Sequence, residues 1–139
     1  MRRVLIVANL TLGGERLWDE VQRRVAEGPC SVHVLVPAAH DPMAGSWTEE
    51  EARADAAVRL ERAMSRLAHL GVDAEGEVGD IRAIDATLDA LRTADYDEII
   101  VSTLPPNVSR WLRLDLVSRL RRTVHVPVTH VVGEPELVG

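Results

Sequence analysis

The chain has 139 residues, which is enough for one globular domain and too few for two ordinary ones. Its net charge of −6 argues against a general nucleic-acid binder, because contacts from basic side chains to phosphates supply most non-specific affinity. All 16 basic residues are arginine, which excludes any mechanism that needs a catalytic or phosphate-binding lysine. We therefore expect one domain over residues 1–139 and no nucleic-acid partner.

Cysteine content and hydropathy indicate the compartment. The single cysteine, Cys30, cannot form an internal disulfide, which is typical of a reducing cytoplasm. No stretch approaches the roughly 20 apolar residues of a membrane span. The opening stretch MRRVLIVANL starts like a signal peptide, but its apolar run is short and fits a first strand better. These features predict a cytoplasmic chain without direct membrane insertion.

The first part of the chain alternates strand and helix patterns. Residues 4–8 are continuously apolar, as expected of a central strand buried on both faces. Gly13–Gly14 lead into a helix that ends near Gly28, and residues 31–37 form a second strand. A Gly-Gly pair before a helix can hold an anion on free N–H groups, but taken alone it indicates an ordinary tight turn.

A long helix, a weak strand and a third helix follow. Thr48 and Glu51 match the capping-box pattern, which starts a helix that runs to about Leu70. Residues 73–78 are a weak strand, expected at an edge of the sheet. Residues 79–94 predict the third helix, in which three bulky side chains are expected to face inward: Ile84, Leu88 and Leu91.

The last part of the chain predicts two more strands around a helix. Residues 98–102 are a buried strand, and residues 126–132 complete the sheet. A helix occupies some part of residues 107–122, and its start stays open at this stage. A late start near Leu116 would allow Asp115 to cap it, whereas an early start would place Pro105–Pro106 at its first turn.

Strand–helix alternation with buried strands predicts an α/β fold with right-handed crossovers. In such sheets ligands bind beyond the carboxyl ends of the strands, where the strand order reverses. If the first and fourth strands are neighbours, the site is framed by Asn9, by residues 102–104 and by the loop of residues 37–47. The histidines have no zinc-ligand spacing, so no metal site is predicted.

Three stretches carry a specific resemblance to a known family. VLIVAN resembles the first strand of the universal stress protein family, and GEVGDIRAI resembles its turn-and-helix signature. Residues 97–132 align without gaps to the family's last strand–helix–strand unit. Together with the pattern, this predicts a three-layer single-domain sandwich with helices on both faces of a five-stranded, mostly parallel sheet of order 3-2-1-4-5.

The resemblance also implies a nucleotide site that this chain has altered. ATP-binding members carry Gly-x-x-Gly, nine residues, then Gly and Ser or Thr; glycines admit close approach of the phosphates. Those positions are Val101, Leu104, Leu114 and Asp115 here, and the first-strand Asp is Asn9. A carboxylate about 4 Å from a phosphate would oppose binding by roughly 4 kcal/mol at an effective dielectric of about 20. We predict no ATP binding in the family manner and no cofactor.

Two functional hypotheses follow from this altered site. The preferred one is a stress or regulatory module that acts by association with itself or an unidentified protein partner. The alternative is a binder of AMP, a nucleoside, ATP or another small ligand in a remodelled pocket. The site positions are Asn9, Val36, Val101, Ser102, Thr103, Leu104, Leu114 and Asp115.

Catalysis is not expected. Ser102 and Thr103 lack a Gly-flanked nucleophile elbow or an evident His–Asp pairing, and a weak ATPase is retained only as an alternative.

The resemblance further implies a homodimer through the last strand. This strand is apolar and lies at a sheet edge, where unpaired backbone groups accept a partner strand. The residues expected in that interface are Val126, Val128, His130, Val131 and Val132.

Overall fold

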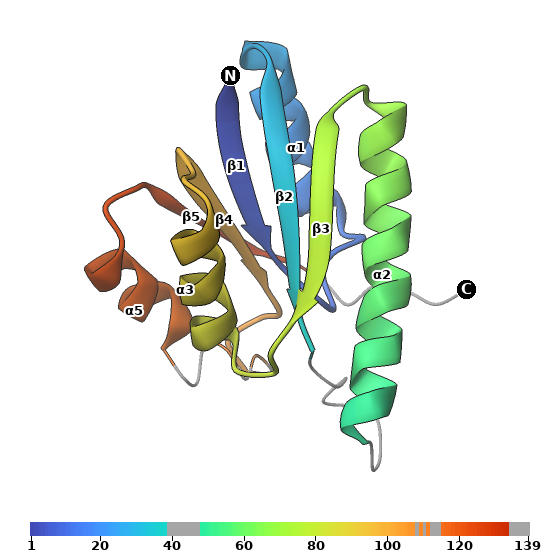
Figure 1. The fold of residues 1–139 in the computed structure, drawn as a ribbon, viewed down its shortest axis with the longest axis vertical. Coiled ribbons are helices and arrows are strands. Elements are labelled where there is room, and N and C mark those ends of the chain that lie inside the picture. Colours follow the sequence, from blue (N-terminus) through green and yellow to red (C-terminus); the bar gives the residue numbers. More distant parts are fainter. Residues whose placement is uncertain (39–47, 108, 110, 112–114, 134–139) are drawn as a thin grey trace.

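The computed structural model describes residues 1–38, 48–107, 109, 111 and 115–133. Its five strands form one sheet in the order β3-β2-β1-β4-β5, with every pair parallel (Figure 1). The strands are β1 (Arg2–Val7), β2 (Cys30–Pro37), β3 (Asp73–Gly79), β4 (Glu98–Thr103) and β5 (Val128–Val132). The described helices are α1 (Glu15–Glu27), α2 (Glu49–His69), α3 (Ala83–Thr93) and α5 (Leu116–Thr123). The predicted fold class and strand order are confirmed.

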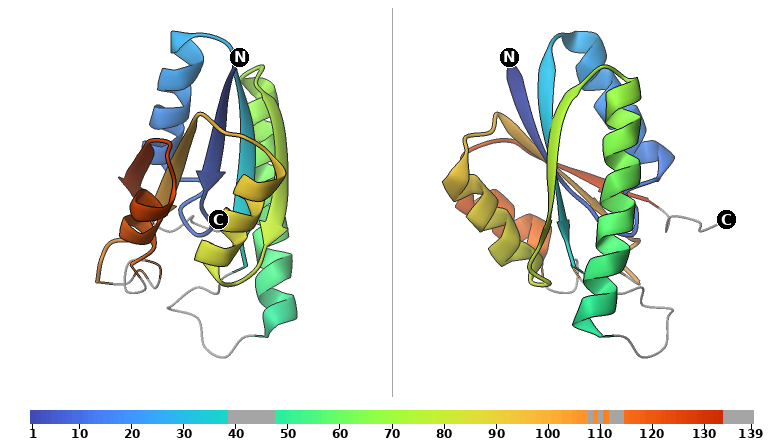
Figure 2. Two further views of the ribbon diagram at one scale, coloured as in Figure 1. Left: turned by 60° about the vertical axis from the view of Figure 1, so that its left-hand side comes forward. Right: turned by 45° about the vertical axis from the view of Figure 1, so that its right-hand side comes forward.

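The sheet is covered on both faces, which explains the continuous apolar run in the first strand. Helices α1 and α2 lie on one face of the sheet and α3 and α5 on the other (Figure 2). Val4 and Ile6 belong to the core under α1 and α2, whereas Leu5 and Val7 belong to the core under α3 and α5. Because alternate side chains of a strand point to opposite faces, a strand covered twice must be apolar at every position. β1 starts at Arg2, earlier than predicted, since its ladder with β2 begins there.

Helix α2 begins at the predicted capping box. The Thr48 hydroxyl accepts from the Glu51 N–H at 3.1 Å, and the Thr48 N–H donates to the Glu51 carboxylate at 3.4 Å. The helix packs tightly on β3, because a Cβ at Gly76 would stand only 2.5 Å from Leu60 Cδ1. The absence of a side chain at Gly76 therefore permits the close approach of α2 to this edge strand, whose edge position was predicted.

Helix α3 buries a different line of residues from the one predicted. Ile84, Leu88 and Leu91 are only half-buried. The side chains that face the sheet are small ones: Ala83, Ala86, Thr87 and Ala90. A Cβ added at Gly79 would lie 3.0 Å from Ala86 Cβ, so the helix is too close to the sheet for bulky residues at its centre. The larger side chains pack along its flanks instead.

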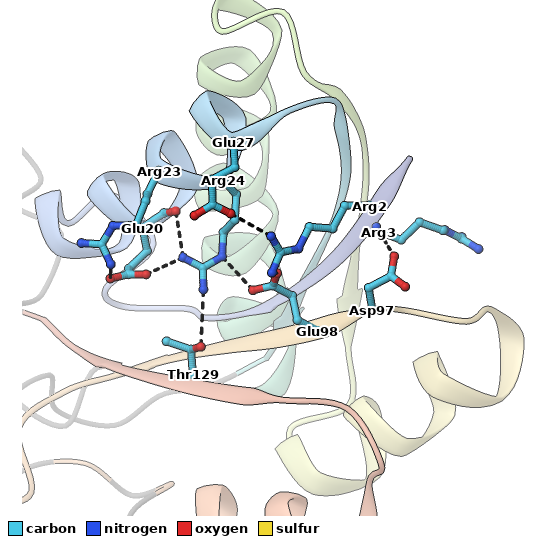
Figure 3. Close-up of polar contacts among 9 residues, drawn as sticks. All are labelled: Arg2, Arg3, Glu20, Arg23, Arg24, Glu27, Asp97, Glu98 and Thr129. Carbon is cyan, nitrogen blue, oxygen red and sulfur yellow. Dashed lines mark hydrogen bonds and ion pairs between the residues drawn. The ribbon is translucent and has the colours of Figure 1, made fainter.

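A buried carboxylate links several elements near the start of the strands. Glu98, at the start of β4, is 2% exposed; its Oε1 accepts from Arg24 Nε at 2.7 Å, and its Oε2 lies 2.5 Å from Arg2 Nη2 (Figure 3). Arg24 also pairs with Glu20 and reaches the Thr129 hydroxyl at 3.4 Å. The network therefore joins α1, β1, β4 and β5 at the end of the sheet opposite the carboxyl ends of the strands.

We predict that Glu98→Gln destabilises the protein by about 3 kcal/mol, because removing one partner leaves guanidinium groups without their buried counter-charge. The matched control is Glu27→Gln, which removes the exposed partner of Arg2 and should cost less than about 1 kcal/mol. Urea unfolding followed by circular dichroism measures both. Equal losses in the two variants would contradict the structural role assigned to Glu98.

Candidate functional site

The predicted site lies where β1 and β4 run side by side and their connections leave toward opposite faces. β1 continues into α1 on one face, whereas β4 is followed by α5 on the other. The adjacency of these two strands, on which the predicted site depended, is confirmed. Of the predicted positions, Val36 and Val101 are fully buried, Val36 in the core under α1 and α2 and Val101 in the core under α3 and α5.

Asn9 follows β1 and is 2% exposed. Its side-chain Nδ2 donates to the Pro37 carbonyl at 2.8 Å, and its Oδ1 accepts from Arg59 Nη1 at 3.1 Å. Both ends of the amide therefore already have protein partners. The contact to Arg59 joins the end of β1 to the middle of α2.

The hydroxyl residues at the end of β4 are paired with neighbouring side chains. Ser102 lies 2.5 Å from the Thr11 hydroxyl, and both side chains are buried. The Thr103 hydroxyl donates to the Leu104 carbonyl at 2.9 Å and lies 2.8 Å from His130 Nε2. Because a hydroxyl has one hydrogen to donate, His130 is the donor to Thr103 in this arrangement.

The chain after β4 differs from a glycine-lined phosphate loop. Leu104 is buried, and the Pro105 carbonyl accepts from the Ser109 N–H at 2.9 Å, an i to i+4 bond typical of a helical turn. This contact favours the helix-initiation interpretation of the two prolines. Leu114 lies outside the described residues.

Helix α5 begins at Leu116, which is the later of the two starts that the sequence left open. The prediction that the Asp115 side chain caps it is wrong. Asp115 has a left-handed backbone (φ 61°, ψ 34°), and no cap bond forms from its side chain, which lies 3.7 Å from Arg122 Nη2. An N-cap side chain normally acts from an extended backbone, so this geometry turns the carboxylate away from the free N–H groups.

A cavity of about 840 Å³, called here the arginine pocket, lies next to the switch point between α1, α2 and the end of β5. Its lining residues are Leu12, Gly13, Gly14, Glu15, Arg16, Trp18, Arg59, Arg62, Ala63, Arg66, Pro105, Val132 and Gly133. The arginines of α2 were not identified from the sequence. Arg59, Arg62 and Arg66 are spaced i, i+3, i+7, which places them on one face of a helix. That spacing is the feature of the sequence from which this group of arginines could have been identified.

The described part of the chain contains neither a metal-ligand cluster nor a membrane-spanning helix. No group of three or more histidine, cysteine, aspartate or glutamate side chains there could hold a metal ion. Among the same residues, no helix is both long and apolar enough to cross a membrane. Burial raises the pKa of the Cys30 thiol, the opposite of the shift that makes a cysteine nucleophilic.

No family model matches the sequence, and no curated protein matches it. Among solved structures, the chain is similar to an AMP-bound universal stress protein family protein from Arabidopsis thaliana, with a TM-score of 0.65, 10% identity, and coverage of 96% of this chain and 93% of that one. A universal stress protein from Archaeoglobus fulgidus matches with a TM-score of 0.59, 17% identity and coverage of 94% and 93%. The chain has the universal stress protein fold.

Part of a larger enzyme is also similar to this chain. The 4-carboxy-2-hydroxymuconate hydratase from Pseudomonas putida matches with a TM-score of 0.52 and 18% identity, over 97% of this chain and 63% of that one. The structures similar to this chain thus include an AMP-bound protein and an enzyme. Function has to be argued from the side chains of the site.

Stability should depend on pH through His130. Burial, with the charge of Arg121 nearby, lowers the pKa of His130 below its ordinary value of 6.5. The unfolded chain therefore binds more protons than the folded chain as the pH falls below about 6.5, and stability is lost there. We predict that His130→Gln, which retains an N–H donor for Thr103, loses less stability than the wild type between about pH 7.5 and 5.5. Urea unfolding at both pH values measures this, and identical losses would contradict it.

Proposed function

We propose that this chain is a cytoplasmic, non-catalytic module of the universal stress protein fold that acts by association and does not bind ATP in the family manner. The observation that carries the proposal is that the polar side chains at the switch point are bonded to one another. Asn9 forms hydrogen bonds with the Pro37 carbonyl and with Arg59. Ser102 pairs with Thr11. The Thr103 hydroxyl bonds to the Leu104 carbonyl and to His130. A nucleotide would have to break these buried bonds to make its own.

The residues at the altered motif positions support the same proposal. Leu104 is buried where the family has a glycine, so no open backbone faces a phosphate there. Asp115 adds a negative charge at the residue before α5, although its side chain is turned away from the free N–H groups, so a phosphate bound at that helix start would still lie near a carboxylate. Steric hindrance by Leu104 and electrostatic repulsion by Asp115 therefore both oppose ATP binding.

The association surface proposed is the outer edge of β5, which is the last strand of the sheet. Pro127 and Gly133 make backbone bonds to β4. Since alternate residues of a strand bond to opposite sides, Val128, His130 and Val132 present their backbone groups outward. Of the other predicted interface positions, Val126 precedes the strand and Val131 is buried in the chain's own core.

Two arginines partly cover this edge. Arg121 donates to the Val128 carbonyl at 3.1 Å, and Arg16 donates to the Val132 carbonyl at 3.3 Å. Both side chains are exposed, so rotation about their side-chain bonds is sufficient to uncover the edge. Pairing with a second strand is therefore expected to compete with these two contacts, which limits indiscriminate association.

The alternative function is binding of a small ligand in a remodelled pocket. It is favoured by the AMP in the Arabidopsis thaliana protein, which has the same fold. Here the ligand would contact Asn9 and Ser102 after their present bonds are exchanged. Arg59 beside Asn9 would then favour a neutral or negatively charged group over a cation.

Isothermal titration with adenosine, AMP and Mg-ATP tests the nucleotide part of the proposal. We expect no saturable heat from adenosine or AMP, and Mg-ATP should bind no more tightly than Mg-tripolyphosphate, because no site accepts the base. ATP binding at least tenfold tighter than tripolyphosphate, and lost in Asn9→Ala, would contradict the proposal. Binding of adenosine or AMP that is lost in Asn9→Ala or Ser102→Ala would support the alternative.

Val128→Pro tests the association surface, because it removes an outward N–H and leaves the bonds to β4 in place. We expect a dimer in the wild type and monomers in this variant by analytical ultracentrifugation, whereas Arg121→Gln should tighten the dimer. Ala74→Pro, at an outward position of the opposite edge strand β3, is the matched control and should remain dimeric. Circular dichroism confirms that each variant is folded; a folded, dimeric Val128→Pro protein would place the contact elsewhere.

A further inference from the structure

His130 is the middle one of the three β5 residues that present their backbone groups outward. The other two, Val128 and Val132, lie at the ends of the strand. When a twofold axis relates two copies of one strand, the strands pair antiparallel, and facing residues exchange N–H and C=O groups. All three outward residues find a partner only if Val128 faces Val132 of the second copy. His130 then faces the same residue of the second copy at the axis.

The His130 side chain lies on the face of the sheet that α5 covers. Its neighbour Val131 packs in the core on the opposite face, and successive side chains of a strand alternate. The half-buried imidazole has its Nε2 at 2.8 Å from the Thr103 hydroxyl, which itself donates to the Leu104 carbonyl. Nε2 therefore carries the ring hydrogen, and a further proton would bind at Nδ1.

The charged groups around His130 are positive. Arg121 of α5 donates to the Val128 carbonyl, and Arg16 of α1 donates to the Val132 carbonyl, one at each end of the strand. From β4, the group that meets the imidazole is the uncharged Thr103 hydroxyl. No carboxylate of the described residues forms an ion pair with His130. Burial, together with the charge of Arg121, lowers the pKa of His130 below its ordinary value of 6.5.

Pairing of two copies would oppose a charge on His130 in two ways. The second strand covers the edge and removes water from the half-buried imidazole, which disfavours its charged form. Two protonated rings on facing residues, whose Cα atoms stand about 5.5 Å apart, would also repel each other. Neutral imidazoles carry neither cost, so the dimer would bind protons at His130 more weakly than the monomer.

We propose that His130 makes the association through β5 depend on pH: two copies pair while their imidazoles are neutral and separate when the imidazoles take up protons. The inference rests on the proposed association and adds its regulation. A proton that binds the monomer more tightly than the dimer drives dissociation. Association is therefore at full strength above about pH 6.5 and weakens as the pH falls below it.

The net charge of the chain acts in the opposite direction. It is −6 with neutral histidines, and protonation of the five histidines brings it closer to zero. Repulsion between two copies then decreases, so net charge alone would strengthen association on acidification. Weaker association at low pH therefore reports a local effect at the β5 edge.

Analytical ultracentrifugation at about pH 7.5 and 5.5 tests the proposal. We expect the dimer Kd to be about tenfold larger at the lower pH, the effect of like charges about 8 Å apart at an effective dielectric of about 30. His130→Gln keeps an N–H donor for Thr103, and its Kd should change less than about twofold. The matched control His69→Gln removes an exposed histidine of α2 and should keep the wild-type change. Circular dichroism at both pH values confirms that each protein is folded.

An NMR titration of the His130 ring gives a second readout. Its pKa should be lower in the wild-type dimer than in Val128→Pro, which is expected to be monomeric. Equal pKa values in the two proteins, or a wild-type Kd that is the same at both pH values, would overturn the pH dependence and leave the association intact. So would a His130→Gln protein that keeps the wild-type change. A wild-type chain that is monomeric at pH 7.5 would overturn the association itself, and the pH dependence with it.

Discussion

The structure depends on one constraint: β1 must be buried on both faces while its neighbour β4 sends the chain to the opposite side of the sheet. The first condition requires two helical layers. Val4 and Ile6 pack in the core on one face of the sheet, and Leu5 and Val7 pack in the core on the other face. The second creates a place beyond the carboxyl ends of the strands where the two connections diverge. The cores, the candidate site and the exposed edge of β5 all follow from this arrangement.

Charge is distributed unequally between the two ends of the sheet. At the start of the strands, Glu98 is buried between Arg2 and Arg24, and the charges there neutralise one another (Figure 3). At the carboxyl ends, four arginines line the arginine pocket, where Glu15 carries the one carboxylate among the described lining residues. The first set of arginines stabilises the fold.

The switch point and the arginine pocket lie side by side, joined by Arg59, which lines the pocket and donates to Asn9. On the other side, Arg16 links the pocket to the β5 edge through the Val132 carbonyl. Arg59 and Arg16 thus connect the pocket to the switch point and to the β5 edge.

Local patterns in the sequence determined the elements, whereas the strand order came from the family resemblance together with the pattern. The apolar run near Val4 and the capping box at Thr48 are local features, so they were readable without tertiary contacts, but the start of α5 stayed open between two alternatives. The partners of Asn9, the small-residue face of α3 and the left-handed backbone of Asp115 depend on distant packing. The arginine pocket could be assembled only by the fold, because α1, α2 and β5 are far apart in the chain and meet through the crossovers of the parallel sheet.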